Sequence, residues 1–149
     1  MSEHHINLEW ARNGGPFARD NYNRDHDVRF SGGQLLRNSA APGAYAGNPD
    51  ASNPEELLLA ALSSCHMLTF LAVCANRGYV IDGYTDAATA ILGKNAEGRI
   101  AVVKAILAPQ VTFSGAKQPT AEEYAKLQER AHQACFIANS VKTQVEVKI

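Results

Sequence analysis

The sequence is poor in cysteine and has no closely spaced cysteine pair. Among its 149 residues the only cysteines are Cys65, Cys74 and Cys135. Three is too few, and odd, for the disulfide framework that holds small secreted domains together. Structural zinc sites usually pair ligands two to four residues apart, and no two cysteines here are that close, so we expect no metal site. Each thiol is therefore either a packed side chain or a reactive group.

An excess of either charge is also missing. The chain has 14 Lys and Arg against 15 Asp and Glu, a formal net charge of -1. Nucleic-acid-binding domains need an excess of cations to neutralise phosphates, so we exclude nucleic acid as a partner. The first ten residues, MSEHHINLEW, contain no basic segment followed by an apolar run and a small-residue cleavage site. Because a secretory signal needs these features, we expect a cytoplasmic protein.

Internal repeats and low-complexity tracts are absent too, and the length suits one hydrophobic core, so we expect a single domain over residues 1–149. The N-terminal third predicts a small antiparallel meander. Its short stretches of mixed apolar and polar residues, separated by glycine-containing turns, are INLEWA, FARDNY, HDVRF and QLL. The β-prone stretches 79–93 and 99–113 predict a hairpin around KNAEG, with a bulge or edge at Pro109. TQVEVKI alternates like a final strand.

The first predicted helix has no charged residue along most of its length. Asn53 can cap it, Glu56 can reach back to the cap, and Gly78 ends it. Residues 57–76 contain no Asp, Glu, Lys or Arg, which is about the length of a membrane span. Polar side chains interrupt this run and amphipathic strands flank it, so we expect protein rather than a membrane around the helix. Because one small chain has limited means of enclosing such a helix, we predict a homodimer.

The three cysteines fall on the two predicted helices. Thr120 and Glu123 form a second capping box, which opens a helix through about Cys135. Nine residues, about two and a half turns, separate Cys65 from Cys74, so these two thiols face opposite sides of the first helix. If Cys65 faces a site, Cys74 faces the core.

Two segments around Cys65 and Cys135 resemble the OsmC/Ohr family of hydroperoxide-reducing proteins, in its OsmC-like branch. NPEELLLAALSSCHM resembles the family's first central helix, in which Asn-Pro-Glu precedes an apolar stretch and a cysteine. AHQACFIANSVK is similar to the second cysteine motif of the family. The resemblance implies an α+β fold, an intertwined homodimer with two central helices per chain wrapped by antiparallel β-sheets. It places the active site at the dimer interface.

The resemblance also implies a thiol-dependent peroxidase that acts on organic hydroperoxides and on hydrogen peroxide. Cys65 would attack the distal peroxide oxygen and become a sulfenic acid, and Cys135 would condense with it to form a disulfide. An external thiol or dithiol reductant would restore the two thiols. No metal, flavin or haem is required.

A reactive thiolate needs positive charge or hydrogen-bond donors, and the family implies an arginine held by a glutamate. Glu55 matches the glutamate by its place in Asn-Pro-Glu. Ten residues of helix, a rise of about 15 Å, separate Glu55 from Cys65, so it would have to serve the thiol of a partner chain. The alternative is a first-turn acid that complements the helix dipole.

Three residues compete for the role of the arginine. Arg29, in VRFSGG, resembles the arginine of the OsmC branch and is favoured, with Arg24 in NRDHDV close behind. Arg19 corresponds more loosely to the glycine-rich start of the Ohr branch. Each of them could equally be a solvated surface charge.

Histidines and one phenylalanine complete the candidates. His132 precedes Cys135 by three residues and shares its helix face, where an imidazole could favour the thiolate. His66 points about 100° around the helix from the preceding cysteine, and His26 is a looser candidate. For all three, a hydrogen-bonded structural role is the alternative. Phe136 stands where the family commonly has proline, which affects the geometry expected around Cys135.

A function of another class fits the same residues. In that alternative the chain is a non-catalytic binding protein, which holds a hydrophobic ligand in an apolar cavity at the dimer interface. A binder would keep its affinity after Cys65→Ser and would consume no peroxide.

Overall fold

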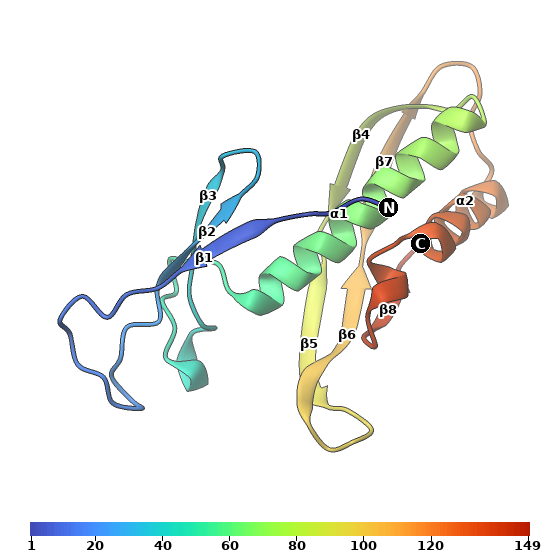
Figure 1. Cartoon of the computed structure of the whole chain (residues 1–149). Helices are drawn as coiled ribbons and strands as arrows, with labels where there is room; N and C mark the ends of the chain where they lie inside the picture. Colours follow the sequence, from blue (N-terminus) through green and yellow to red (C-terminus); the bar gives the residue numbers. More distant parts are fainter. The chain divides into compact units, whose positions relative to one another are not determined.

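The computed structural model describes residues 1–149. They divide into two compact units, residues 1–57 and 58–149. In Figure 1 the first unit carries strands β1 to β3, and the second carries the remaining strands, helix α2 and most of helix α1. The expectation of a single domain over the whole chain stays a prediction.

The N-terminal unit is built on an antiparallel sheet of three strands in the order β1-β2-β3. The strands are β1 (Ile6–Glu9), β2 (His26–Phe30) and β3 (Leu35–Asn38). The predicted meander is thus confirmed, except that FARDNY is not a strand. Its backbone closes a local turn instead, because the Asn21 N–H donates to the Ala18 carbonyl at 3.0 Å and the Ala18 N–H donates to the Asn21 side chain at 3.2 Å.

The connection after β3 contains a short 3-10 helix, η1 (Gly43–Tyr45), and is held by specific hydrogen bonds. The buried Ser39 donates its N–H to the Ser52 carbonyl at 2.8 Å and accepts the Asn48 N–H on its hydroxyl at 3.0 Å. Gly47 is required here, since a Cβ at this position would lie 1.6 Å from the Ala40 carbonyl oxygen.

The C-terminal unit contains two small sheets, with strand orders β4-β7 and β5-β6-β8. Their strands are β4 (Val80–Asp86), β5 (Thr89–Lys94), β6 (Ile100–Leu107), β7 (Pro109–Ser114) and β8 (Gln144–Val147). The predicted hairpin around KNAEG is confirmed as β5 and β6, which pair antiparallel. The final strand β8 is confirmed too, but it pairs parallel with β6, a departure from the purely antiparallel sheets that we expected.

Each of the two long β-prone stretches is in fact two strands. The first stretch leaves its first strand, β4, after Asp86, and the second stretch enters its second strand, β7, at Pro109. These two break points are neighbours, because Pro109 pairs with Asp86. The carboxylate of Asp86 occupies this junction: it accepts the Ala108 N–H at 2.7 Å and the Ser63 hydroxyl at 2.5 Å. Proline has no N–H to give to a ladder, which suits it to the first position of a strand.

Both predicted capping boxes are present. Helix α1 (Pro54–Asn76) is preceded by Asn53, whose side chain accepts the Glu56 N–H at 3.0 Å. Helix α2 (Ala121–Ala134) is capped reciprocally by Thr120 and Glu123. Gly78, two residues beyond the end of α1, has a positive φ of 75°, as a helix stop requires.

The core of the C-terminal unit lies where the β4–β7 pair meets the two helices, an arrangement visible in Figure 1. Phe70 of α1 is fully buried and makes an edge-on contact with Tyr124 of α2, with ring centroids 6.1 Å apart. Cys74 is fully buried beside it, which confirms that this thiol faces the core. Burial raises the pKa of Cys74 to about 11.

Helix α1 is only partly covered within one chain. By length and composition it could cross a membrane, a test that the core helices of soluble proteins also pass. Only 22% of its most apolar window is buried, and Leu68 is 60% exposed. The expectation that a second copy covers this side stays a prediction.

Candidate active site

The C-terminal unit brings Cys65 and Cys135 together. Cys65 lies in the middle of α1 and is half-buried, whereas Cys135 is the C-cap of α2 and is buried. Both are free thiols, and their side chains are hydrogen-bonded to each other. Seventy residues of sequence separate them, so their proximity comes from the packing of α1 against α2.

The pKa of Cys65 lies below its ordinary value of 9.0. Burial alone would raise this pKa, but hydrogen bonds from the Cys135 thiol and from the backbone N–H groups of Ile137 and Phe136 outweigh it. The hydroxyl of Thr69 donates to the Cys65 carbonyl oxygen at 2.8 Å, so its one proton is engaged there. The principal donors to the sulfur are therefore the second thiol and two amides.

Cys135 has the opposite tendency. Burial raises its pKa, and the neighbouring Cys65 raises it further. The Ala138 N–H, 3.5 Å from the Cys135 sulfur, offsets this only in part. Of the pair, Cys65 thus loses its proton first and Cys135 keeps one to donate.

Cys65 opens onto an apolar groove of about 640 Å³. No charged side chain lines it, and the Phe136 ring at its edge is 80% exposed. The lining consists of Ala61, Ser64, Cys65, Leu68, Thr69, Ala72, Ala134, Phe136 and Ile137. Such a groove accommodates a hydrocarbon group better than a charged one.

Glu55 and the three candidate arginines, Arg19, Arg24 and Arg29, belong to the N-terminal unit. Glu55 lies in the first turn of α1, and one oxygen of its carboxylate is buried without a hydrogen-bond partner. A buried carboxylate oxygen without a donor is costly, so this group needs a donor that one chain does not give it. Its place in the first turn also agrees with the helix-dipole alternative.

The structure places the candidate arginines in different surroundings. Arg24 is held in place: its guanidinium donates to the carbonyls of Tyr22 and Arg19 at 2.7 and 2.8 Å and lies 4.0 Å from the centre of the Tyr22 ring. It lines an apolar cleft of the N-terminal unit with Trp10, Phe17, Tyr22 and His26. Arg29 is exposed on β2, and its side chain makes no hydrogen bond or ion pair. This placement favours Arg24 as a preorganised donor, while the roles of both stay predictions.

His66 points away from the groove and into the contact between the helices. It is buried, and its Nε2 lies 2.7 Å from the Gln128 Oε1, while the Gln128 amide donates to the Tyr124 hydroxyl at 2.9 Å. Burial lowers the pKa of His66, and nearby His132 lowers it further. The Nδ1 atoms of both histidines are buried without a partner. His132 thus lowers the pKa of His66 and is not among the groups that shift the pKa of Cys135. That pKa is set by burial, by Cys65 and by backbone amides.

His26 has both ring nitrogens engaged within the N-terminal unit. Its Nδ1 lies 2.9 Å from the Arg24 carbonyl oxygen, and its Nε2 lies 3.0 Å from the Asn38 side-chain nitrogen. A neutral imidazole that donates at Nδ1 and accepts at Nε2 satisfies both contacts. This is the structural role that we gave as the alternative.

Sequence reasoning did not identify the amides of Phe136 and Ile137, or Gln128. Backbone donors leave no residue-type signal, and Gln128 is one of several polar residues on an amphipathic helix. The contact of Thr69 could have been predicted from the sequence. A threonine four residues after a cysteine in a helix places its hydroxyl at the carbonyl of that cysteine.

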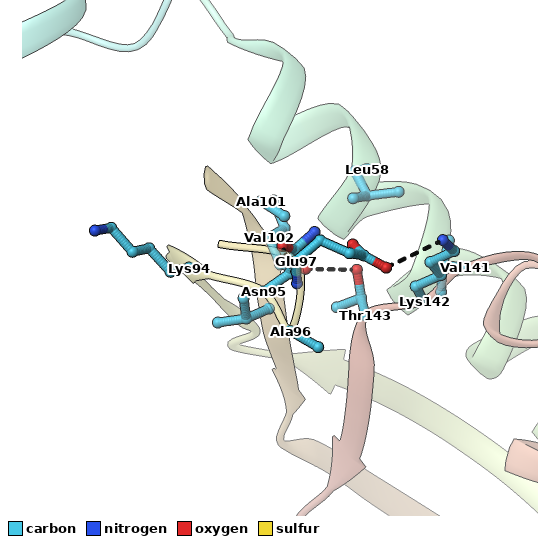
Figure 2. A pocket seen from close by; sticks show the side chains of 11 residues that line it. Leu58, Lys94, Asn95, Ala96, Glu97, Ala101, Val102, Val141, Lys142 and Thr143 are labelled. Carbon is cyan, nitrogen blue, oxygen red and sulfur yellow. Dashed lines mark hydrogen bonds and ion pairs between the residues drawn. The ribbon is translucent and has the colours of Figure 1, made fainter. Parts of the chain in front are cut away.

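A second concavity, drawn in Figure 2, lies beside the β5–β6 turn and is lined by both apolar and polar residues. Two of its contacts are the Thr143 hydroxyl on the Val102 carbonyl at 2.7 Å and the ion pair of Lys142 with Glu97 at 4.0 Å. It contains no thiol or histidine, whereas the groove described above contains Cys65.

A family model described as OsmC-like protein matches residues 47–149, more than half of the chain. The chain belongs to the OsmC/Ohr family. Among solved structures, an OsmC-like protein of unknown function from Vibrio cholerae is 43% identical, with a TM-score of 0.95 and coverage of 100% of this chain and 99% of that one.

Two more distant relatives match nearly the whole of this OsmC-like chain. An organic hydroperoxide resistance protein from Elizabethkingia anophelis is 23% identical over 99% of this chain and 94% of that one, with a TM-score of 0.72. The uncharacterized protein YmaD of Bacillus subtilis is 24% identical over 100% of this chain and 94% of its own length. The α+β fold with two helices and the family, both predicted from the two cysteine segments, are confirmed.

Proposed function

We propose that this OsmC-like protein is a thiol-dependent peroxidase that reduces organic hydroperoxides, with hydrogen peroxide as a further substrate. The observation that carries the proposal is the hydrogen-bonded pair of thiols, in which the lowered pKa belongs to Cys65, the thiol that opens onto the apolar groove. Solved relatives with this fold include proteins named for organic hydroperoxide resistance.

In the first step the Cys65 thiolate attacks the distal oxygen of the hydroperoxide. A sulfur–oxygen bond forms, the oxygen–oxygen bond breaks, and the leaving alkoxide takes a proton to become an alcohol. Cys65 is oxidised by two electrons to a sulfenic acid. The apolar lining of the groove suits the hydrocarbon part of an organic hydroperoxide.

In the second step the Cys135 sulfur attacks the sulfenic sulfur. The disulfide forms, the sulfur–oxygen bond breaks, and the hydroxyl leaves as water with the proton of the Cys135 thiol. The hydrogen bond between the thiols provides the proximity that this step needs. An external thiol or dithiol then supplies two electrons and two protons, as expected of a protein working in the reducing cytoplasm.

We further propose that the working unit is a homodimer. Two observations support it: the uncovered apolar side of α1, and the partnerless buried oxygen of Glu55. In the dimer, Glu55 of one chain would hold an arginine, Arg24 or Arg29, near the Cys65 thiol of the other. No cofactor is needed.

The proposal is tested by following the consumption of cumene hydroperoxide with a dithiol reductant. Cys65→Ser should abolish turnover, and Cys135→Ser should leave Cys65 as a sulfenic or over-oxidised acid, detected by mass. The matched control is Cys74→Ser, which should keep turnover because Cys74 is buried in the core. The enzymatic function is lost if the wild-type protein consumes no hydroperoxide with any thiol reductant.

A non-catalytic binding protein for a hydrophobic ligand is the second candidate, because the same groove is apolar and its Phe136 ring is exposed. Binding that is unchanged by Cys65→Ser, together with an absence of peroxide consumption, would favour it.

A further inference from the structure

The segment that follows α2 contains two backbone donors without a carbonyl acceptor. The neighbouring N–H groups are engaged: those of Cys135, Asn139 and Ser140 donate to carbonyls, and that of Ala138 donates to the Cys135 sulfur at 3.5 Å. The N–H groups of Phe136 and Ile137 donate to no backbone or side-chain oxygen. Backbone N–H groups shielded from water are almost always paired, so the N–H of the half-buried Ile137 in particular needs an acceptor.

Both N–H groups face the sulfur of Cys65, and the N–H of Ile137 is shared with the sulfur of Cys135. Phe136, Ile137 and Cys65 line one groove, in which there is no carboxylate to compete for the donors. Successive N–H groups that point the same way form a concavity for an anion. A thiolate is the anion that this groove can produce.

We propose that the N–H groups of Phe136 and Ile137 form an anion site that holds the Cys65 thiolate, so that one segment both stabilises the nucleophile and carries the resolving cysteine. Hydrogen bonds from these two amides are among the causes that lower the pKa of Cys65. The importance of the site for turnover rests on the proposed peroxidase function, but the anion site itself is measurable without peroxide.

Residue 136 must therefore supply a backbone N–H, while its ring is dispensable for this purpose. The ring is 80% exposed. Phe136→Ala removes the ring and keeps the donor, whereas Phe136→Pro removes the donor. Cys135 has φ -73° and ψ 112°, a conformation that suits a residue before proline. Since the Phe136 N–H has no role in a helix or sheet, proline removes no hydrogen bond of the fold there.

The experiment measures the rate at which iodoacetamide alkylates Cys65 as a function of pH, with the site of modification identified by peptide mass. Loss of one hydrogen bond to the thiolate should slow the alkylation of Cys65 by roughly tenfold at a fixed pH below the pKa of the thiol. Phe136→Pro should show this loss and Phe136→Ala should not. Equal rates in Phe136→Pro and wild type, or equal losses in Phe136→Pro and Phe136→Ala, would overturn the proposal.

A second measurement needs no substitution in the segment. The amide proton resonances of Phe136 and Ile137 should shift along the titration of Cys65 in the wild-type protein, and should lose that shift in Cys65→Ser. Amide resonances that ignore the titration would refute the anion site. A protein that shows the shifts but consumes no peroxide would keep the anion site and lose the peroxidase, so the two failures are distinguishable.

Discussion

Replacing Gln128 with leucine should remove the side-chain hydrogen bond that joins α2 to α1 at His66. Gln128 is fully buried and connects His66 of α1 to Tyr124, at 2.7 and 2.9 Å. Leucine fills a similar volume, so the loss is mainly polar. In Gln128→Leu both nitrogens of the buried His66 ring are without a partner, because Nδ1 already lacks one.

The expected loss follows from the groups left unpaired. A buried donor without an acceptor costs about 1–3 kcal/mol. Gln128→Leu should therefore lower the free energy of unfolding by roughly 2 kcal/mol, which changes the ratio of folded to unfolded protein by about 30-fold. The matched control is Gln133→Leu on the same helix, where an exposed glutamine donates to Glu129 at 3.1 Å. The control should stay within about 0.5 kcal/mol of wild type.

The assay is urea unfolding followed by circular dichroism, at one protein concentration because an oligomer would make the midpoint concentration-dependent. Replacing both partners by apolar residues, in His66→Leu with Gln128→Leu, should recover part of the loss, because the buried imidazole that Gln128→Leu leaves unpaired is then absent. The reasoning is refuted if Gln128→Leu costs no more than Gln133→Leu, or if the double variant shows no recovery.

Three further outcomes are expected. Because burial holds the pKa of His66 below its ordinary value of 6.5, the unfolded chain takes up a proton there before the folded protein does; urea midpoints should therefore fall as pH drops below 6.5, and less so in His66→Leu. Cys74, with a pKa of about 11, should stay unmodified under iodoacetamide at neutral pH while Cys65 reacts, and equal labelling of the two would contradict the placement of Cys74 in the core. Gly47→Ala should lower the melting temperature, because the new Cβ would meet the Ala40 carbonyl oxygen at 1.6 Å; an unchanged melting temperature would show that the loop moves freely.

Local signals in the sequence located both helices closely. The capping residues at Asn53 and Thr120 act within one turn of chain, so their residue types are sufficient to place the helix starts. Helical periodicity likewise separated Cys74 from Cys65 correctly, since it depends only on the number of residues between them.

Pairings between distant segments were harder to predict. The change of sheet at Asp86 and Pro109 depends on which strands lie side by side, and each stretch has the same β-forming composition on both sides of the break. The parallel partner of β8 was missed for the same reason. FARDNY was misread because its asparagine closes a local turn, which competes with the strand.

The sequence predicted the two thiols of the candidate site, but not the groups that donate hydrogen bonds to Cys65. The two cysteine segments resemble a known pattern, so Cys65 and Cys135 could be named together. The groups that lower the pKa of Cys65 are the other thiol and main-chain N–H groups, which every residue except proline possesses. Only the folded chain shows which of them face the sulfur.

The carboxylate of Asp86 sets a practical limit on how the groove can be redesigned. One oxygen accepts from Ser63, two residues before Cys65 in α1, and the other accepts from Ala108 at the strand junction. A glutamate would place both oxygens one methylene farther out and could not meet both donors at once. Libraries that vary the groove to accept bulkier ligands should therefore leave Ser63 and Asp86 unchanged, and should diversify the open edge at Leu68 and the ring of Phe136.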